Sequence, residues 1–358
     1  MYRWLVCLIT TSLLFGCGNA VKPDASSVAP AQQSIPGMSD SLSDDPIEYA
    51  DSYASKDEVK VFMAYMVDKH HYDALLLEAA FASIAPREKV IQKSDNQPEV
   101  MIPYYEYKTR FVASSRIEGG RQFMQQHRAW LLKAEREFGV PAAIIVSIIG
   151  VETLYGRVTG ERDVFTSLAT LAFDYPRRQD YFQRELEAYL LLAREQGWLL
   201  GNTKASYSGA LGMVQFMPSN YRRLALDYDG DGVVDLWNSP ADAIGSVANY
   251  LSSKKWQPQQ PIIVKADMAS QQVDNDAFQA WVNKGRQTYK TPSEWRVYGL
   301  TAPAQALQAS TGVIALRESA DTVGYWLAYD HFFAVMSYNP SRRYTMAVIE
   351  LAEAIIKE

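Results

Sequence analysis

The chain has 358 residues, enough for two or three domains of ordinary size. Hydrophobic residues make up 48% of it and charged residues 21%, as in an ordinary soluble globular protein. Its formal net charge is -6 and it carries no block of Lys and Arg, which argues against nucleic acid as a partner. The patterns GxxxxGK[ST], GxSxG, HExxH and CxxC are all missing, so no nucleotide, serine-hydrolase or zinc site and no organic cofactor is predicted.

The N-terminal segment has Arg3, then an apolar stretch over 4–15, then Cys17. The stretch is short for a transmembrane helix and predicts an export signal over 1–16. The run LFGC at 14–17 resembles a bacterial lipobox, which implies cleavage before Cys17 and lipidation of its thiol; a plain signal peptide is the alternative. The residue after the anchor, Gly18, resembles that of lipoproteins sorted to the outer membrane, so we expect an outer membrane lipoprotein facing the periplasm.

Residues 17–45 are rich in Ser, Pro, Ala, Asp and Gln and have no apolar periodicity. Such a segment buries too little surface to fold, so it predicts a flexible tether from lipidated Cys17. A coil of this length reaches roughly 30 Å from the membrane.

Helical patterns dominate from there to about residue 254. The segment DEVKVFMAYMVDKH at 57–70 places apolar residues at helical spacing, and RIEGGRQFMQQHRAWLLKAEREFGVP at 116–141 predicts one long helix that ends at Gly139. We expect a helical N-terminal domain over 46–135.

The pattern changes after Trp256. The runs QPIIVKA, WRVYGL, GVIALRE and WLAYDHFFAVMSYN are short, β-branched or aromatic, and separated by turn residues, which predicts a small sheet. A last helix, YTMAVIELAEAIIKE, ends the chain. The predicted fold class is α+β, mostly α, with a small β insertion.

One carboxylate stands out in the segment GVPAAIIVSIIGVETLYGR. The helix is apolar on nearly every face and should be buried, and Glu152 lies at its end. Burial would raise the pKa of this carboxyl, as a general acid requires, and Gly150 and Gly156 would leave room beside it. The alternative is that Glu152 ends the helix in solvent or pairs with Arg157.

The segment KASYSGALGMVQFMPSNY at 204–221 is unlike a regular amphipathic helix. Ser206 and Gln215 within it could orient a carboxyl or bind an acetamido group. A flexible glycine-containing loop is the alternative.

These segments, with FDYPRRQDYFQRELE, SPADAIGSVANYL and SYNPSRRYTMAV, resemble the membrane-bound lytic murein transglycosylase B family, lysozyme-like enzymes of peptidoglycan turnover. The resemblance covers nearly the whole chain after the tether and is densest over 138–251. It implies a lysozyme-like catalytic core over 136–256, a small β-containing peptidoglycan-binding region over 257–335, and a C-terminal segment at 336–358 that returns to the core.

The resemblance also assigns site residues. It implies that Glu152 is catalytic, and that the residues supporting it in the cleft are Ser206, Gln215, Tyr338, Asn339 and Tyr344. The residues it places along the glycan and peptide subsites are Tyr107, Arg177, Arg178, Tyr181 and Tyr250. Tyrosine faces can pack on sugar rings and an arginine pair can bind stem-peptide carboxylates. A core role for each Tyr and a surface role for each Arg are the alternatives.

The mechanism implied by the resemblance needs one carboxylate. Glu152 would protonate the oxygen between N-acetylmuramic acid and N-acetylglucosamine, and then accept the proton of the muramyl C6 hydroxyl as a 1,6-anhydro ring closes. An ordinary glycosidase uses two carboxylates, and the residues that could supply a second are Glu161, Asp163, Asp174 and Asp180. A hydrolytic muramidase and a non-catalytic peptidoglycan-binding scaffold are the alternative functions.

Residues 227–238, DYDGDGVVDLWN, match the first part of an EF-hand calcium loop. The predicted ligands at positions 1, 3, 5, 7 and 9 are Asp227, Asp229, Asp231, the Val233 carbonyl and Asp235. Position 12 is Asn238 where a Glu is usual, so we expect Asp242 to replace it, although Asp242 also fits a helix-capping role. The resemblance favours a structural Ca²⁺. The expected partners are therefore glycan strands and stem peptides, with the membrane reached through the lipid anchor.

Overall fold

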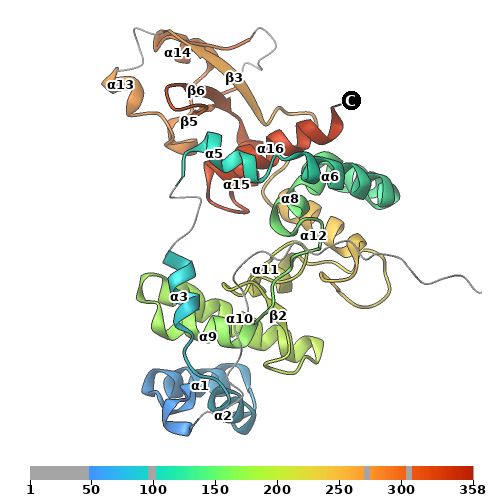
Figure 1. Cartoon of the computed structure of the whole chain (residues 1–358), viewed down its shortest axis with the longest axis vertical. Helices are drawn as coiled ribbons and strands as arrows, with labels where there is room; N and C mark the ends of the chain where they lie inside the picture. Colours follow the sequence, from blue (N-terminus) through green and yellow to red (C-terminus); the bar gives the residue numbers. More distant parts are fainter. Residues whose placement is uncertain (1–47, 96–101, 270–274, 304–308, 358) are drawn as a thin grey trace, which may run out of the picture. The chain divides into compact units, whose positions relative to one another are not determined.

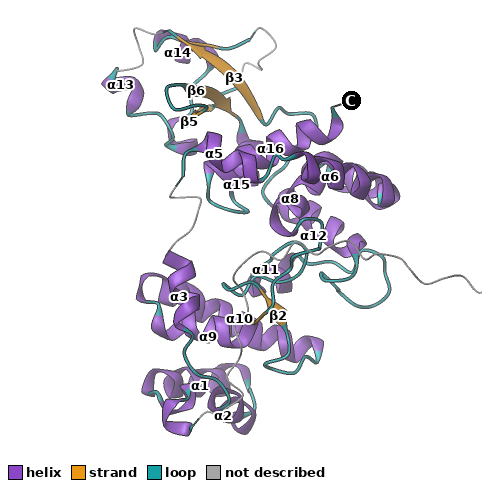
Figure 2. Ribbon diagram, in the orientation of Figure 1, coloured by secondary structure: helices purple, strands orange, loops and turns teal. Residues whose placement is uncertain are grey.

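The computed structural model describes residues 48–95, 102–269, 275–303 and 309–357 (Figure 1). The predicted signal, Cys17 and the predicted tether lie outside these ranges. Residues from 47 onward form one compact unit. Helices predominate and the strands are few and short, as the sequence predicts (Figure 2). In the part of the chain that the structure describes, no helix combines the length and apolar character needed to cross a membrane.

The first helices pack onto a later helical pair. They are η1 (Tyr49–Asp51), η2 (Tyr53–Ser55), α1 (Asp57–His70), α2 (Ala74–Ala82) and α3 (Glu88–Asp95), and the pair is α9 (Val164–Asp174) and α10 (Gln179–Gln196), with η4 (Pro176–Arg178) between them. The ring of Phe62 from α1 lies edge-on to Phe81 of α2 and Phe173 of α9, with centroids 6.3 and 5.7 Å away. These contacts join the start of the predicted N-terminal domain to helices of the predicted core.

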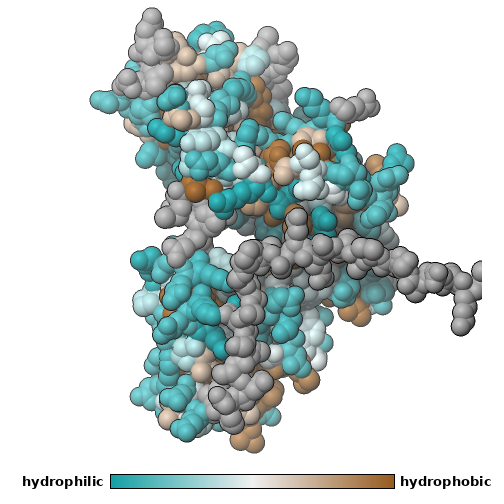
Figure 3. Space-filling model, viewed as in Figure 1, coloured by the Kyte–Doolittle hydropathy of each residue, from teal (hydrophilic) through white to brown (hydrophobic). Residues whose placement is uncertain are grey.

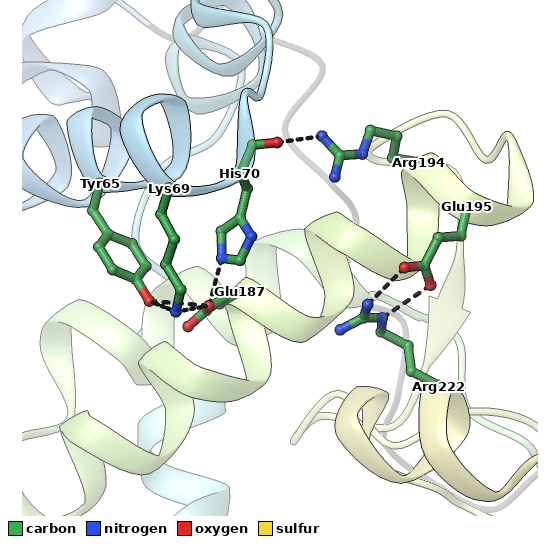
Figure 4. A network of polar contacts seen from close by, with 7 residues as sticks. All are labelled: Tyr65, Lys69, His70, Glu187, Arg194, Glu195 and Arg222. Carbon is green, nitrogen blue, oxygen red and sulfur yellow. Dashed lines mark hydrogen bonds and ion pairs between the residues drawn. The ribbon is translucent and has the colours of Figure 1, made fainter.

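A polar network fixes α1 to α10 (Figure 4). The Glu187 carboxylate accepts from Lys69 at 3.1 Å, from the Tyr65 hydroxyl at 3.0 Å, and pairs with the His70 ring at 2.6 Å. Arg194, further along α10, donates to the carbonyl of His70 at 2.8 Å. The left-handed residue that follows α1 directs the chain away from this contact.

The second half of the predicted N-terminal domain packs elsewhere. It comprises α5 (Tyr104–Tyr107), η3 (Lys108–Arg110), α6 (Ser114–Gln126) and α7 (Arg128–Phe138). The predicted long helix is wrong in one respect, because the backbone of His127 leaves helical geometry at φ -110° and ψ 24° and divides it into α6 and α7. Gly139 ends α7 in the left-handed conformation, as predicted. Both helices contact α8 (Ala142–Thr153), which is buried along almost its whole length.

Two further helices complete the surroundings of α8. They are α12 (Pro240–Ser253) and α16 (Arg342–Ile356), and α16 also contacts α6. The short helix α11 (Pro218–Leu224) packs against α10 and α12. The last helix, which starts at Arg342, thus packs against a helix that starts at Ala142, and this places residues of α8 and α16 side by side.

The predicted sheet is present, with a different strand composition. A two-stranded ribbon pairs β1 (Arg162–Asp163) with β2 (Lys204–Ala205), and an antiparallel sheet has the order β4 (Leu300–Thr301), β3 (Ile263–Met268), β6 (Val323–Ala328), β5 (Gly312–Arg317). In its register Trp326 of β6 lies between Lys265 and Ile314. The helices in this region are α13 (Asp276–Gln279), η6 (Gly285–Thr288), α14 (Pro292–Val297) and α15 (Asp330–Met336).

Two of the predicted strands were wrong in part. The first half of the run WRVYGL belongs to α14, because Thr291 and Glu294 form a reciprocal capping box that starts the helix at Pro292, before the run begins. The run WLAYDHFFAVMSYN supplies β6 only as far as Ala328 and then becomes α15. Aromatic content alone does not distinguish a strand from a short buried helix.

Hydrophilic residues cover most of the face shown in Figure 3. The large apolar side chains with more than half of their area exposed are Tyr49, Val61, Leu75, Val158, Leu199, Val233, Val297 and Ile356. Scattered residues of this kind are usual on a soluble protein.

Candidate active site

A cleft of about 920 Å³ contains the acid singled out from the sequence. Its walls come from the end of α8, the start of α10, the loop 206–217, strand β5 and the segment 338–343. Glu152 is the only carboxylate that lines it among the residues the structure describes. The candidates for a second acid lie elsewhere, since Asp163 caps α9 and Asp174 binds Tyr53 and Lys56, while Glu161 and Asp180 are exposed.

Glu152 is half-buried, one residue before α8 ends. The hydroxyl of Tyr344, a buried residue in the first turn of α16, donates to Glu152 Oε1 at 2.6 Å. The sequence alternative of an ion pair with Arg157 is not observed, because the Arg157 guanidinium donates to the carbonyl of Leu154 at 2.9 Å. Tyr344 of α16 therefore holds one oxygen of the Glu152 carboxyl by a hydrogen bond, and Glu152 still lines the cleft.

The space beside Gly150 is filled by a protein side chain and is not left open beside Glu152 as predicted. A side chain at this position would lie 2.6 Å from the ring of Tyr155, so the missing Cβ accommodates that ring and leaves no room for a substrate. Tyr155 reaches this position because Leu154 and Tyr155 turn the chain through left-handed conformations, and its hydroxyl donates to the carbonyl of Arg116 at 2.6 Å. The contact fixes the turn immediately after Glu152.

The loop 206–217 presents two polar groups to the cleft. The Ser206 hydroxyl accepts from the Ala210 N–H at 3.1 Å and lies 3.2 Å from the Ser208 hydroxyl, so its own hydrogen can be donated to Ser208 or to a ligand. Gln215 has φ 51°, and its amide donates to the carbonyls of Thr159 and Gly212, both at 3.0 Å. With both amide hydrogens used, Gln215 can offer a ligand its carbonyl oxygen.

Tyr338 and Asn339 also line the cleft. The Tyr338 hydroxyl donates to the carbonyl of Val214 at 2.5 Å, which ties the C-terminal segment to the loop. Burial raises the pKa of Tyr338 well above its usual range, and the charge of Glu152 adds to the effect. Tyr338 is therefore neutral and acts here as a hydrogen-bond donor.

The predicted substrate-binding residues fall into two groups. Arg178 and Tyr181 line the cleft, and the guanidinium of Arg178 lies 4.3 Å from the centre of the Tyr181 ring. Burial raises the pKa of Tyr181 to about 12, so it too is neutral.

Three predicted substrate-binding residues do not form the cleft wall. Arg177 is exposed and pairs with Asp95 at 2.9 Å. Tyr107 is fully buried and packs on Phe111. Tyr250 is buried too, with its ring 4.7 Å from that of Tyr338 and its hydroxyl donating to the Ser337 carbonyl at 2.5 Å, so it supports Tyr338 from behind.

Sequence reasoning missed several residues of this wall. Arg317 comes from β5, and Arg342 and Arg343 begin α16, within the segment SYNPSRRYTMAV. Their proximity in sequence to Tyr338 and Tyr344 was a signal for the pair at 342–343. No local signal marks Arg317, because it reaches the cleft only through the packing of the sheet.

The predicted calcium loop brings three carboxylates together. Single oxygens of Asp227, Asp229 and Asp242 lie within 4.8 Å of one another. Asp242 is fully buried, which raises the pKa of its carboxyl, and the charge of Asp229 raises it further. Three like charges at this distance repel one another, and a cation between them would remove the repulsion.

The other predicted ligands have different partners. Asp231 accepts from the Val233 N–H at 2.8 Å, and Asp235 accepts from the N–H groups of Trp237 and Asn238 at 2.9 and 3.0 Å. Ser239, rather than Asp242, caps α12. Asp242 instead accepts from the N–H groups of Tyr228 and Asp235. The loop therefore fits a calcium ion at three of the predicted positions.

Comparison with known proteins agrees with these features. The transglycosylase SLT domain family matches residues 54–353. The membrane-bound lytic murein transglycosylase B of Escherichia coli (strain K12) is 36% identical over 313 residues, which cover 85% of this chain and 84% of that protein.

Solved structures are similar as well. The Escherichia coli lytic transglycosylase Slt35 in complex with calcium has a TM-score of 0.76 and 33% identity, with 87% of this chain and 97% of that one covered. SltB3 from Pseudomonas aeruginosa in complex with NAG-NAM-pentapeptide has a TM-score of 0.73 and 27% identity, with coverages of 86% and 80%. With a family match over most of its length and a relative that is 36% identical, the chain belongs to the transglycosylase SLT domain family and is a lytic transglycosylase that acts on peptidoglycan.

Proposed function

We propose that Glu152 alone performs the acid and base steps of this reaction. Its protonated carboxyl donates to the glycosidic oxygen between N-acetylmuramic acid and N-acetylglucosamine, and the bond from that oxygen to muramyl C1 breaks. The muramyl C6 hydroxyl then attacks C1, and its proton passes to the Glu152 carboxylate. The products are a free hydroxyl on N-acetylglucosamine and a 1,6-anhydro muramic end, with Glu152 protonated again.

The absence of a second cleft carboxylate among the described residues carries this proposal. Glycosidases with two acids place them about 5 Å apart, or roughly 6.5 to 9.5 Å apart when a water attacks. Here the acetamido group of the substrate would stabilise the positive charge at C1, and no water would be activated. The nucleophile belongs to the substrate, so the protein needs to move only one proton in each direction.

The surroundings of Glu152 suit both of its states. The apolar wall of α8 penalises a charge and so favours the acid form before the bond breaks. The Tyr344 hydroxyl favours the carboxylate that forms afterwards, because it donates to Oε1. The two influences oppose each other, which suits a group that must give up a proton and take one back.

The polar groups beside Glu152 match a sugar with an acetamido substituent. The carbonyl oxygen of Gln215 can accept from the acetamido N–H, and Ser206 and Asn339 can hydrogen-bond to the carbonyl or hydroxyl groups around it. Tyr181 offers a ring face along the glycan path, with Arg178 packed on it. We infer that Tyr107, Arg177 and Tyr250 contribute by holding these parts in place.

Replacing Glu152 with Gln tests the proposal. The variant keeps the size and the Tyr344 contact but has no proton to donate, so we expect it to fold with the wild-type melting temperature and to lose at least a thousandfold of its rate, as general acid–base catalysis contributes about 10²- to 10⁴-fold for each step. The measurement is loss of turbidity of a cell-wall suspension. Retained activity would remove Glu152 from the mechanism.

We further propose that the loop 227–238 binds a structural Ca²⁺ through Asp227, Asp229 and Asp242, with the carbonyl of Val233 and the carboxylates of Asp231 and Asp235 as additional ligands. The clustering of three acids supports the ion, and so does the calcium complex of Slt35. Asp242 links the loop to α12, so the ion would stiffen the support of Tyr250.

We also propose that Cys17 is lipidated and holds the enzyme at the outer membrane facing the periplasm. The LFGC run supports this, and the relative from Escherichia coli is named as membrane-bound. Replacing Cys17 with Ser should release the protein from the membrane fraction into the soluble periplasmic fraction. A variant that still sediments with membranes would contradict the anchor.

A further inference from the structure

The cleft has a basic wall that the reaction at Glu152 does not use. We call it the α16 wall, and it consists of Arg317 at the end of β5 and Arg342 and Arg343 at the start of α16. Cations from separate parts of the chain thus line the cavity that contains Glu152.

Arg342 occupies an unfavourable position for a cation. It is the first residue of a 15-residue helix whose first turn has no acidic residue, and the N-terminal end of a helix carries partial positive charge. Arg342 is exposed as a whole residue, and partial desolvation of its guanidinium lowers its pKa, with the neighbouring charge of Arg343 lowering it further. Within the described ranges Arg342 has no ion pair. An anion in the cleft would relieve this repulsion.

Arg317 is held toward the same cavity by the sheet. Its side chain is exposed and its only hydrogen bond within the described residues is a long one, 3.3 Å, to the carbonyl of Ala320. Asn283 fixes the strand, because its side chain accepts from the Ala315 N–H at 3.0 Å and donates to the Ala315 carbonyl at 3.3 Å. Asn283 therefore positions β5, and Arg317 remains able to bind a ligand.

The α16 wall lies near the reaction centre, and the part of the substrate that carries negative charge there is the stem peptide. Arg342 lines the same cleft as Glu152, and the helix that it begins also supplies Tyr344, whose hydroxyl contacts Glu152. The muramic residue that reacts there carries the stem peptide on its lactyl group, and stem peptides have free carboxylates. Guanidinium groups bind carboxylates through two parallel hydrogen bonds. Arg178, by contrast, packs on the rings of Tyr181 and Phe182 and suits the sugar path.

We propose that Arg342 and Arg317 bind the carboxylates of the stem peptide attached to the reacting muramic residue. This inference rests on the proposed function, because it takes that residue to lie at Glu152. It makes the α16 wall a determinant of which peptidoglycan the enzyme selects, with strands whose stem carboxylates are free preferred over strands whose carboxylates are amidated.

The test measures binding in the Glu152→Gln background, where the ligand is not consumed. Two soluble ligands are compared by calorimetry, namely an N-acetylglucosaminyl-muramyl peptide with free carboxylates and the same compound with its carboxylates amidated. We expect the free form to bind about tenfold more tightly, since a hydrogen bond to a charged group contributes roughly that factor or more. Adding Arg342→Ala or Arg317→Ala should reduce this ratio toward one.

The control is Arg296→Ala, which removes an exposed arginine from α14 and should leave the ratio unchanged. Equal affinities for both ligands before any arginine is removed would overturn the proposal, and so would a ratio that survives both Arg342→Ala and Arg317→Ala. Arg317 and Arg342 are both exposed, so both variants should fold, and each reports independently on the ratio. The products of the wild-type enzyme report separately on the role of Glu152. If they carry anhydro ends while the arginine variants leave the affinity ratio of the two ligands unchanged, only the proposal for the α16 wall is wrong.

Discussion

At the scale of single residues, the Glu152–Tyr344 contact is the feature on which the chemistry depends. The two residues come from the end of α8 and the start of α16, and a buried tyrosine hydroxyl 2.6 Å from the acid can donate only to it. Tyr344 thus acts as a positioning residue that also favours the carboxylate state. Its effect should be visible in the pH dependence of the rate as well as in the rate itself.

Replacing Tyr344 with Phe removes this hydrogen bond and keeps the ring. We expect about a tenfold fall in kcat, from the loss of a hydrogen bond to a charged group. The alkaline limb of the pH–rate profile should move to higher pH, because the acid form of Glu152 is then favoured more strongly. A lower rate with an unmoved profile would mean that Tyr344 serves packing alone.

How far the sequence predicts these residues depends on whether they share a local pattern. Glu152 stands out because an acid at the end of a helix that is apolar on nearly every face is unusual, and Ser206 and Gln215 lie in a distinctive loop. The arginines at 317 and 342 were not identified, since a charged residue on a strand end or helix start is ordinary until the tertiary structure places both at one cavity. The room predicted beside Glu152 at Gly150 is filled by the ring of Tyr155, which the sequence pattern does not reveal.

At the scale of elements, the differences from prediction come from local hydrogen bonding. His127 interrupts a helix that has continuous apolar periodicity, and a capping box starts α14 just before a predicted strand, so that the first half of that run is helical. Periodicity reports which residues are buried but not where a backbone turns. The capping pattern of Thr291 and Glu294 was readable from the sequence and identifies the helix correctly once it is considered.

The loop 227–238 is the element whose contribution to the stability of the fold can be tested most directly. If Ca²⁺ neutralises its clustered acids, removing calcium with a chelator should lower the melting temperature by several degrees, because roughly 1 kcal/mol corresponds to about 2 to 4 °C for a chain of this size or somewhat smaller. Asp242→Asn should lower the melting temperature in calcium and abolish the effect of the chelator.

The control for this experiment is Asp68→Asn, which removes an exposed acid near the end of α1 and should retain the full response to the chelator. A melting temperature that does not depend on calcium in the wild-type protein would exclude the structural ion. Differential scanning calorimetry measures both variants under the same conditions.

At the scale of the whole molecule, the catalytic cleft depends on contacts between distant parts of the sequence. Tyr338 binds the loop at Val214, Tyr344 binds Glu152, and the sheet supplies Arg317 to the same cavity. The predicted division into an N-terminal domain, a core and a β region follows the order of the sequence. The packing instead joins α1 to α10, and α6 and α7 to α8, across the predicted boundary at residue 135.

The central claim is that one carboxylate performs both proton transfers and that the nucleophile is the C6 hydroxyl of the substrate. Mass spectrometry of the sugars released from purified peptidoglycan tests it most directly. We predict muramic ends that weigh one water less than those of a hydrolase, as 1,6-anhydro rings require. Reducing muramic ends of full mass would show that water is the nucleophile and would contradict the single-carboxylate mechanism.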